Sequence, residues 1–275
     1  MKDITLGQFY PVESVIHSLD PRTKILCTIV LVVFVFLSGT FIGFGFSAFF
    51  IALVTILAHI PLKNMLKGLK GIYFLLIFTF VLNVFFYSAG NVLVEIWFIR
   101  ITDGGLIRAA FMALRLMLLV TGAGLLTLTT SPIELTDGIE SLLSPLKIIG
   151  FPAHEIAMMM SIALRFIPTL TEETDKIMKA QAARGAVFDE GGLIKRAKAI
   201  VPLLIPLFVS AFRRAEELAM AMEARCYHGG EGRTRLKILK FQGRDLAAAG
   251  VMVVFCAAVL IDKVILADLL PFLAG

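Results

Sequence analysis

Long uncharged, apolar stretches dominate the first half of the chain. The longest runs from Ile25 to Ile60 and contains no Lys, Arg, Asp or Glu. As one helix it would be about 54 Å long at 1.5 Å per residue, whereas the hydrocarbon core of a bilayer is roughly 30 Å thick. The stretch must therefore fold back, and Ser38-Gly39-Thr40 is the natural turn. The pattern predicts two membrane-spanning helices, over residues 24–38 and 41–60, the second ended by Pro61.

Three further apolar stretches predict additional spans, over residues 72–87, 106–130 and 246–266. Composition agrees with this pattern, because hydrophobic residues make up 58% of the chain and the mean hydropathy is +0.89. Soluble domains contain roughly 45–50% apolar residues. The chain is therefore predicted to be an all-α integral membrane protein with five transmembrane helices.

Basic residues cluster on one side of the predicted spans, before the first span and after the second. They are Lys2, Arg22, Lys24, Lys63, Lys67 and Lys70. The loops on the other side hold little charge beyond Arg100, so the positive-inside rule predicts a plasma-membrane protein with a cytoplasmic N-terminus and an external C-terminus. The same rule accounts for the net charge of +5, and we expect no nucleic-acid partner. Residues 1–20 are polar, so the first span itself is expected to direct insertion.

The charged segment between the fourth and fifth spans predicts a cytoplasmic-side domain. Ser131-Pro132-Ile133-Glu134 places a cap Ser, a first-turn Pro and a Glu at the third helical position, which predicts a helix start. Long helices are predicted over residues 153–183 and 193–225, the latter bent at Pro202 and Pro206. The predicted division is a membrane domain over residues 1–130, a coupling-helix domain over 131–243, and a C-terminal transmembrane helix over 244–275.

Both long helices end in an Ala-Arg-small triplet, Ala183-Arg184-Gly185 and Ala224-Arg225-Cys226. An exposed guanidinium at a helix end presents a fork of donors that suits a carboxylate or backbone carbonyls on a partner. Alternatively, each arginine only complements the dipole of its own helix C-terminus. The repetition favours two similar docking sites, so the sequence indicates a mechanical coupler.

The residue patterns that would form a phosphate-binding, metal-binding or catalytic site are missing from the sequence, or their residues are scattered. Gly229-Gly230-Glu231-Gly232 does not end in Gly-Lys-Ser/Thr, so no phosphate cradle is expected. Cys226 with His228 is two ligands short of a zinc site, and we expect no metal site. No catalytic constellation stands out, and carboxylates are missing from spans one to four, which disfavours a proton-coupled carrier. A secondary transporter or an intramembrane enzyme remain as alternatives.

Asn83 and Arg115 are polar residues that lie within predicted spans. A charge such as Arg115 faces protein or water because lipid is costly for it. It could contact a membrane partner or join an internal hydrogen-bond network. The alternative is that it snorkels toward lipid headgroups.

Several motifs occur in an order that makes the chain resemble a known family, the transmembrane T component of energy-coupling factor (ECF) transporters. The resemblance covers nearly the whole chain and is closest to the vitamin-type group, in which one T subunit serves interchangeable substrate-binding S subunits. Besides the two arginine triplets, the motifs are Gly7-Gln8-Phe9-Tyr10-Pro11, Leu19-Asp20-Pro21-Arg22-Thr23-Lys24, Thr130-Ser131-Pro132-Ile133-Glu134-Leu135-Thr136-Asp137-Gly138 and Leu164-Arg165-Phe166-Ile167-Pro168-Thr169-Leu170.

This resemblance implies a non-catalytic scaffold of an ATP-driven vitamin or micronutrient importer. Two ABC-type ATPase subunits would hold the ATP and Mg²⁺, and this chain would bind no cofactor. Arg184 would meet one ATPase and Arg225 the other. The family usually has Gly where this chain has Cys226. A Gly adopts a left-handed turn cheaply, so Cys226 is expected to need a strained or different cap.

The resemblance also implies a docking surface for S subunits, which we predict on the apolar, Met-rich faces of the two long helices. The predicted platform residues are Met158, Met159, Ile162, Phe166, Phe208, Phe212, Ala215 and Met222. Met is flexible and suits surfaces that accept different partners, although ordinary core packing is the alternative for each one. The competing function is a stand-alone secondary transporter.

Overall fold

The computed structural model describes residues 9–87, 91–96, 99–186, 188, 192–230 and 239–266. Lys2, Gly7, Gln8 and the C-terminal residues 267–275 lie outside the described residues. The chain forms two compact units, a membrane unit (described residues 9–139 and 239–266) and an arm unit (residues 140–230). The predominantly helical architecture confirms the predicted all-α class.

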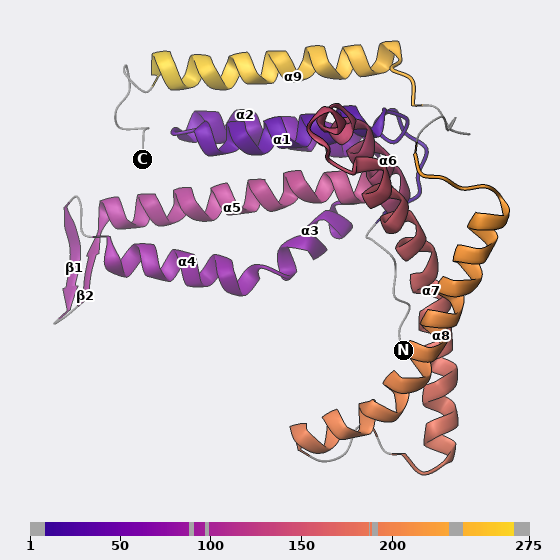
Figure 1. Cartoon of the computed structure of the whole chain (residues 1–275). Helices are drawn as coiled ribbons and strands as arrows, with labels where there is room; N and C mark the ends of the chain where they lie inside the picture. The colour runs from indigo at the N-terminus through magenta and orange to yellow at the C-terminus, as the bar shows by residue number, and fades with distance from the viewer. Residues whose placement is uncertain are drawn as a thin grey trace. The chain divides into compact units, whose positions relative to one another are not determined.

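The membrane unit contains seven of the described helical elements entirely. They are α1 (Pro21–Leu37), α2 (Phe41–Leu57), α3 (Leu62–Lys70), α4 (Tyr73–Phe86), α5 (Asp103–Thr129), α9 (Gly243–Ile261) and the π-helical η2 (Asp262–Leu266), besides a β-hairpin described below. Figure 1 shows α5 lying between α4 on one side and α1 and α2 on the other, with α9 on the far side of α1 and α2. The predicted turn at Ser38-Gly39-Thr40 is confirmed, because Thr40 caps α2 by accepting the Gly43 N–H at 3.0 Å.

Aromatic rings and a close helix approach fill the core of this unit. Phe111 on α5 packs edge-on against Phe44 of α2, with ring centroids 5.2 Å apart. Gly122 lets α5 approach α1, because a Cβ there would lie 2.8 Å from a methyl group of Leu31. Phe255 of α9 packs against the Phe50 ring of α2 at 4.7 Å. Burial of these apolar side chains holds α9 against the other helices of the unit, although α9 is far from them in the sequence.

Helix length supports some of the five predicted spans directly. Among the described helices, α5 and the helical stretch Gly243–Val264 are each long and apolar enough to cross a membrane alone. The pair α3 and α4 meets the same criteria together but is bent by 62°. The helices α1 and α2 each have 17 residues, or about 25 Å at 1.5 Å per residue, so their crossing remains a prediction.

A short β-hairpin that the sequence analysis missed lies between α4 and α5. Its strands are β1 (Val92–Ile96) and β2 (Ile99–Thr102), and they pair antiparallel with Glu95 opposite Arg100. Thr102 ends the hairpin and caps α5, because its hydroxyl accepts the Gly105 N–H at 3.1 Å. The available signal was the set of β-branched residues in these strands, Val92, Val94, Ile96, Ile99 and Ile101.

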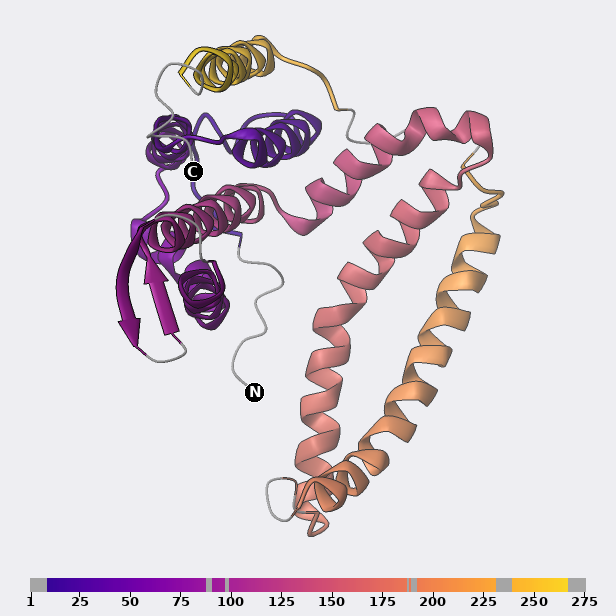
Figure 2. The same ribbon diagram turned by 90° about the vertical axis from the view of Figure 1, so that its left-hand side faces the viewer.

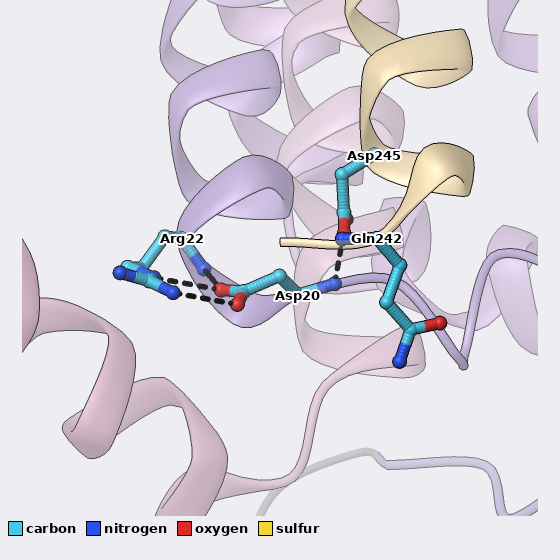
Figure 3. A network of polar contacts seen from close by, with 4 residues as sticks. All are labelled: Asp20, Arg22, Gln242 and Asp245. Carbon is cyan, nitrogen blue, oxygen red and sulfur yellow. Dashed lines mark hydrogen bonds and ion pairs between the residues drawn. The ribbon is translucent and has the colours of Figure 1, made fainter. Parts of the chain in front are cut away.

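A polar network ties the start of α1 to the start of α9 (Figure 3). The Asp20 backbone N–H donates to Asp245 Oδ1 at 2.8 Å, and the Gln242 N–H donates to Asp245 Oδ2 at 2.8 Å. Arg22 donates to both carboxylate oxygens of Asp20, at 3.0 and 2.9 Å. Both aspartates are buried, and each of their carboxylate oxygens accepts a hydrogen bond, so the network holds two distant parts of the sequence together.

Arg115 belongs to an internal network, which decides between the alternatives raised by its sequence. Its Nη2 donates to the Ser38 carbonyl at 3.0 Å, and its guanidinium lies 5.6 Å from the centre of the Phe44 ring. Nearby, the buried Asp262 accepts a hydrogen bond from the Thr40 hydroxyl. Gly43 permits this contact, because a Cβ there would lie 2.6 Å from Asp262 Oδ2.

The helix α6 (Pro132–Leu143) begins in the membrane unit and ends in the arm unit. Ser131 caps it as predicted, since its hydroxyl accepts the Glu134 N–H at 3.3 Å. Gly138 lies close to α1, where a Cβ would be 3.0 Å from side-chain atoms of Pro21 and Ile25. This contact explains why the division between the units falls after Ile139, whereas the charge pattern indicated a boundary before Ser131.

The arm unit consists of the 3₁₀ helix η1 (Ser144–Ile149) and two long helices, α7 (Ala153–Ala183) and α8 (Leu193–Ala224). Their bounds agree with the predicted ones. Figure 2 shows α7 and α8 running antiparallel. Figure 1 shows that α8 changes direction in its first half, the part that contains Pro202 and Pro206, as expected for residues without a backbone donor.

Candidate functional site

The end of α7 is a hydrogen-bonded turn that presents Arg184. Arg184 is the C-cap, and Gly185 follows it in the left-handed region with φ +89°. The Ala186 N–H donates to the Gln181 carbonyl at 3.0 Å, and the Gly185 N–H donates to the Ala182 carbonyl at 2.9 Å. These two bonds define a Schellman motif, which satisfies the last carbonyls of the helix.

The end of α8 has the same geometry with different residues. Arg225 is the C-cap, the Tyr227 N–H donates to the Met222 carbonyl at 3.0 Å, and the Cys226 N–H donates to the Glu223 carbonyl at 2.8 Å. Cys226 takes the place of Gly185 and has φ +55°. The sequence predicted a strained or a different cap at this position. The structure has the same cap as α7, and Cys226 is the strained residue in it, because a side chain in the left-handed region crowds the backbone.

Both arginine side chains are exposed, and neither guanidinium has a hydrogen bond or ion pair to a residue that the structure describes. All their N–H donors are therefore available at a surface. Carbonyls in the last turn of each helix, among them Gln181 and Ala182 in α7 and Met222 and Glu223 in α8, already accept backbone N–H groups, so the cap forms without the guanidinium. The two sites share backbone geometry, residue type and exposure.

The two arginines lie at opposite ends of the antiparallel pair. An ion pair between Glu173 of α7 and Arg214 of α8, at 3.1 Å, marks where the helices meet. Each terminal arginine lies about three helical turns from this pair, roughly 16 Å, in opposite directions. The arrangement separates two equivalent surfaces by roughly 30 Å.

Glu173 sits at this contact with its charge stabilised. A hydrogen bond from Ser210 lowers the pKa of Glu173 below its usual range, and the Arg214 guanidinium lowers it further against the opposing effect of burial. Arg214 of α8 is thereby paired with α7. The pair links the C-terminal half of α7 to the C-terminal half of α8.

The predicted platform residues divide by exposure. Met159, Phe208, Phe212 and Ala215 are exposed, whereas Met158, Ile162, Phe166 and Met222 are partly buried within the arm unit. On α8 the exposed residues Phe208 and Phe212 belong to a longer apolar stripe that also includes Val201 and Ile205. These last two residues were not among the predicted platform residues. The spacing of four, three and four residues along this stripe, up to Phe212, was the available signal.

A polar cavity of about 420 Å³ lies at the start of α7, lined by Glu140, Lys147, His154 and His228, among others. His154 Nδ1 lies 2.9 Å from Glu140 Oε1. Among the described residues, no three His, Cys, Asp or Glu side chains are placed to hold a metal ion.

Comparison with known proteins finds similar sequences over nearly the whole chain. A family described as CbiQ, cobalt transport protein, matches residues 12–236, which include both arginine triplets. A protein of Thermosediminibacter oceani is 58% identical over 248 residues, covering 90% of this chain and 93% of the relative. A protein of Clostridium kluyveri is 55% identical over 262 residues, covering 95% of each chain. A protein of Bacillus subtilis is 47% identical over 273 residues, covering 99% of each.

All three relatives are named energy-coupling factor transporter transmembrane protein EcfT. The chain belongs to this family of ECF transporter transmembrane proteins. Membership confirms the resemblance found in the motifs and the placement in a membrane. It also makes the chain a transporter component, in agreement with the prediction that it is not an enzyme. The names of these ECF transmembrane proteins give no substrate.

The strained cap of this ECF transmembrane protein yields a stability prediction. Cys226→Gly should raise the free energy of unfolding by about 0.5–1 kcal/mol, because it relieves a left-handed side chain at some entropic cost. Gly185→Cys should lower it by about 1 kcal/mol for the opposite reason. Thermal unfolding in detergent measures both. A lower melting temperature for Cys226→Gly would show that the cysteine stabilises the cap through its side chain.

Proposed function

We propose that the chain is the non-catalytic scaffold of an ECF-type importer for a vitamin or micronutrient. It would couple ATP hydrolysis by two ABC-type ATPase subunits to movement of a substrate-binding S subunit. ATP and Mg²⁺ would bind to the ATPases, with the arm unit on the cytoplasmic side of the plasma membrane, the N-terminus cytoplasmic and the C-terminus external. The observation that carries this proposal is the pair of equivalent, exposed arginine caps at opposite ends of one helix pair.

The separation of the caps favours two docking sites. Two surfaces roughly 30 Å apart are better suited to contact two globular subunits that lie side by side than to enter one small groove on a single subunit. Ala183, Arg184 and Gly185 would contact one ATPase, and Ala224, Arg225 and Cys226 the other. Because a helix is stiff along its axis, a change in the distance between the ATPases would move α7 against α8. The Glu173–Arg214 pair is the contact about which they would turn.

The exposed apolar stripe on α8 supports an S-subunit platform. Ile205, Phe208 and Phe212 are 62%, 61% and 68% exposed, and an aqueous surface rarely leaves such side chains uncovered in a row. Met159 of α7, at 58%, adds a flexible thioether that adapts to different partners. We propose that these residues contact the S subunit.

Cysteine cross-linking tests the platform. Cysteines at Met159 or Phe212 should cross-link to cysteines on a bound S subunit in membranes that hold the whole transporter. Glu217→Cys is the matched control, since Glu217 is exposed on the same helix but on a different face. Efficient cross-linking from position 217, with none from 159 or 212, would place the platform elsewhere.

A stand-alone secondary transporter is the second candidate, because Asp262 is a buried carboxylate at the end of the last apolar helix. Intramembrane carboxylates often serve proton coupling. Asp262 is hydrogen-bonded to Thr40, and it lines neither the cavity at the start of α7 nor the apolar groove between α1, α2, α5 and α9, which ranks this candidate lower. Substrate uptake by liposomes that contain only this chain would establish it.

A further inference from the structure

The short 3₁₀ helix η1, between α6 and α7, carries apolar side chains that nothing in the described chain covers. Ile148 and Ile149 are 92% and 84% exposed, more than any other large apolar side chain that the structure describes. Leu146 is also exposed. Contiguous exposed apolar side chains mark a surface that contacts a protein or a membrane.

The helical period sorts the residues of η1 into three ridges. A 3₁₀ helix has three residues per turn, so side chains three positions apart lie one above the other. The ridges are Ser144 with Lys147, Pro145 with Ile148, and Leu146 with Ile149. The polar ridge, Ser144 and Lys147, lines the polar cavity at the start of α7, and none of the four apolar residues does. The polar ridge therefore adjoins the arm unit, and the two apolar ridges are left without a partner in it.

A hydrogen-bonded turn holds these side chains in place. The Gly150 N–H donates to the Lys147 carbonyl at 3.0 Å, and the Phe151 N–H donates to the Leu146 carbonyl at 3.3 Å. Gly150 ends η1 in the left-handed region, with φ +81°. The apolar ridges are thus presented by a closed turn, so covering them would cost little backbone entropy.

Chain length keeps η1 near the membrane. Gly138 of α6 packs against the start of α1, where a Cβ would lie 3.0 Å from side-chain atoms of Pro21 and Ile25. The start of α1 is the predicted cytoplasmic end of the first span. From Gly138 to Ile148 the chain rises about 18 Å, at 1.5 Å per α-helical residue and 2.0 Å per 3₁₀ residue. The bilayer surface is therefore within reach of η1.

The composition of η1 favours lipid over a protein partner. Protein contacts depend most on Trp, Tyr, Arg and Met, and η1 contains none of them. A rigid partner would have to enclose aliphatic side chains on two of the three ridges, whereas fluid acyl chains can surround them. Lys147 is the only charged residue between Glu140 and His154, so insertion of this segment would bury no carboxylate.

We propose that η1 inserts its two apolar ridges into the cytoplasmic surface of the bilayer, at the boundary between headgroups and acyl chains. Interfacial helices bury an apolar face about 5–10 Å deep in this region. Insertion would hold the joint between α6 and α7 at the membrane surface. The proposal requires only that the chain lies in a membrane, so it is independent of the proposed docking of ATPases and S subunits.

Tryptophan fluorescence of the full chain in liposomes tests the insertion. The chain contains a single tryptophan, Trp97, so Trp97→Phe combined with Ile148→Trp places one reporter in η1. Lipids with brominated acyl chains quench an indole that lies among them. The matched control is Met220→Trp in the same Trp97→Phe background, since Met220 is an exposed residue of α8. We expect about threefold stronger quenching at position 148 than at position 220, because only η1 would reach the acyl chains.

Two further variants complete the test. Val253→Trp reports the quenching of a residue on the exposed side of α9, a predicted span. Ile149→Asp, added to Ile148→Trp, should reduce quenching at position 148 to the level at position 220, because a carboxylate resists insertion. Its melting temperature should be unchanged, since Ile149 is exposed. Equal quenching at positions 148 and 220 would overturn the proposal. So would quenching at position 148 that Ile149→Asp leaves intact, because the introduced tryptophan alone would then account for it.

Discussion

Replacing Arg184 or Arg225 by glutamate is expected to abolish coupled uptake while the chain remains folded. If each guanidinium contacts acidic or carbonyl groups of an ATPase, the substitution places like charges together in a partly desolvated contact. Breaking such a pair typically costs about 3–5 kcal/mol, or a loss of affinity of at least 100-fold. The double variant should lose ATPase recruitment more completely than either single variant, because the two sites are separate.

Uptake by cells and co-purification of the ATPases measure this effect. Arg213→Glu is the matched control, because Arg213 is an exposed arginine within α8 rather than at its end. Arg184→Lys keeps the charge but loses the planar fork, so an intermediate defect is expected. If the arginines only complemented their own helix ends, the glutamate variants would lose about 0.3–1 kcal/mol of stability and retain uptake. That outcome would contradict the docking role.

Asp245→Ala is expected to loosen the start of α9 and to lower the free energy of unfolding by about 2–4 kcal/mol. The substitution leaves the N–H groups of Asp20 and Gln242 without an acceptor, and a buried unsatisfied donor costs about 1–3 kcal/mol. Asp245→Asn should cost less, since it retains one acceptor oxygen. Thermal unfolding in detergent and amide hydrogen exchange over the first turn of α9 measure the effect.

Leu246→Ala is the control, because Leu246 is the adjacent residue and is 78% exposed to the bilayer or solvent. An equal loss of stability in Leu246→Ala and Asp245→Ala would mean that packing, rather than the hydrogen bonds, holds the helix. Unchanged hydrogen exchange in Asp245→Ala would contradict the role of the network.

The same network predicts a dependence on pH. Burial tends to raise the pKa of Asp20, but hydrogen bonds from Arg22 outweigh this effect and hold it below its ordinary value of 3.8. A carboxyl with a lowered folded-state pKa contributes stability above its unfolded pKa and loses it as the pH falls through the folded value. The melting temperature should therefore fall in acid below about pH 4, and Asp20→Asn should reduce this dependence. An unchanged profile in Asp20→Asn would assign the acid sensitivity to other groups.

The sequence predicts the helix ends well, because local chemistry sets them. Ser38-Gly39-Thr40, Ser131 and the residues after Ala183 each supply a turn or cap whose partners lie within a few positions. The two Ala-Arg-small triplets also predicted that Arg184 and Arg225 lie at helix ends. The shared Schellman geometry at Cys226 was not predicted, because the bonds of the cap outweigh the local cost of a left-handed cysteine.

Contacts between distant segments could not be predicted in the same way. The bond between Asp20 and Asp245 joins residues from opposite ends of the chain, and neither pattern nor spacing links them. Arg214 pairs with Glu173, 41 positions earlier in the chain, and no local pattern links the two residues. The boundary inside α6 likewise depends on the contact of Gly138 with α1, which the charge pattern does not record.

Site-specific photo-cross-linking tests the central claim most directly. A photoreactive residue would be introduced in place of Arg184 or Arg225, one site at a time, in membranes that contain the assembled transporter. The account predicts that each position cross-links to an ATPase subunit, and that the control position 217 does not. Cross-links from both arginine positions only to this chain itself, or to no protein at all, would contradict it.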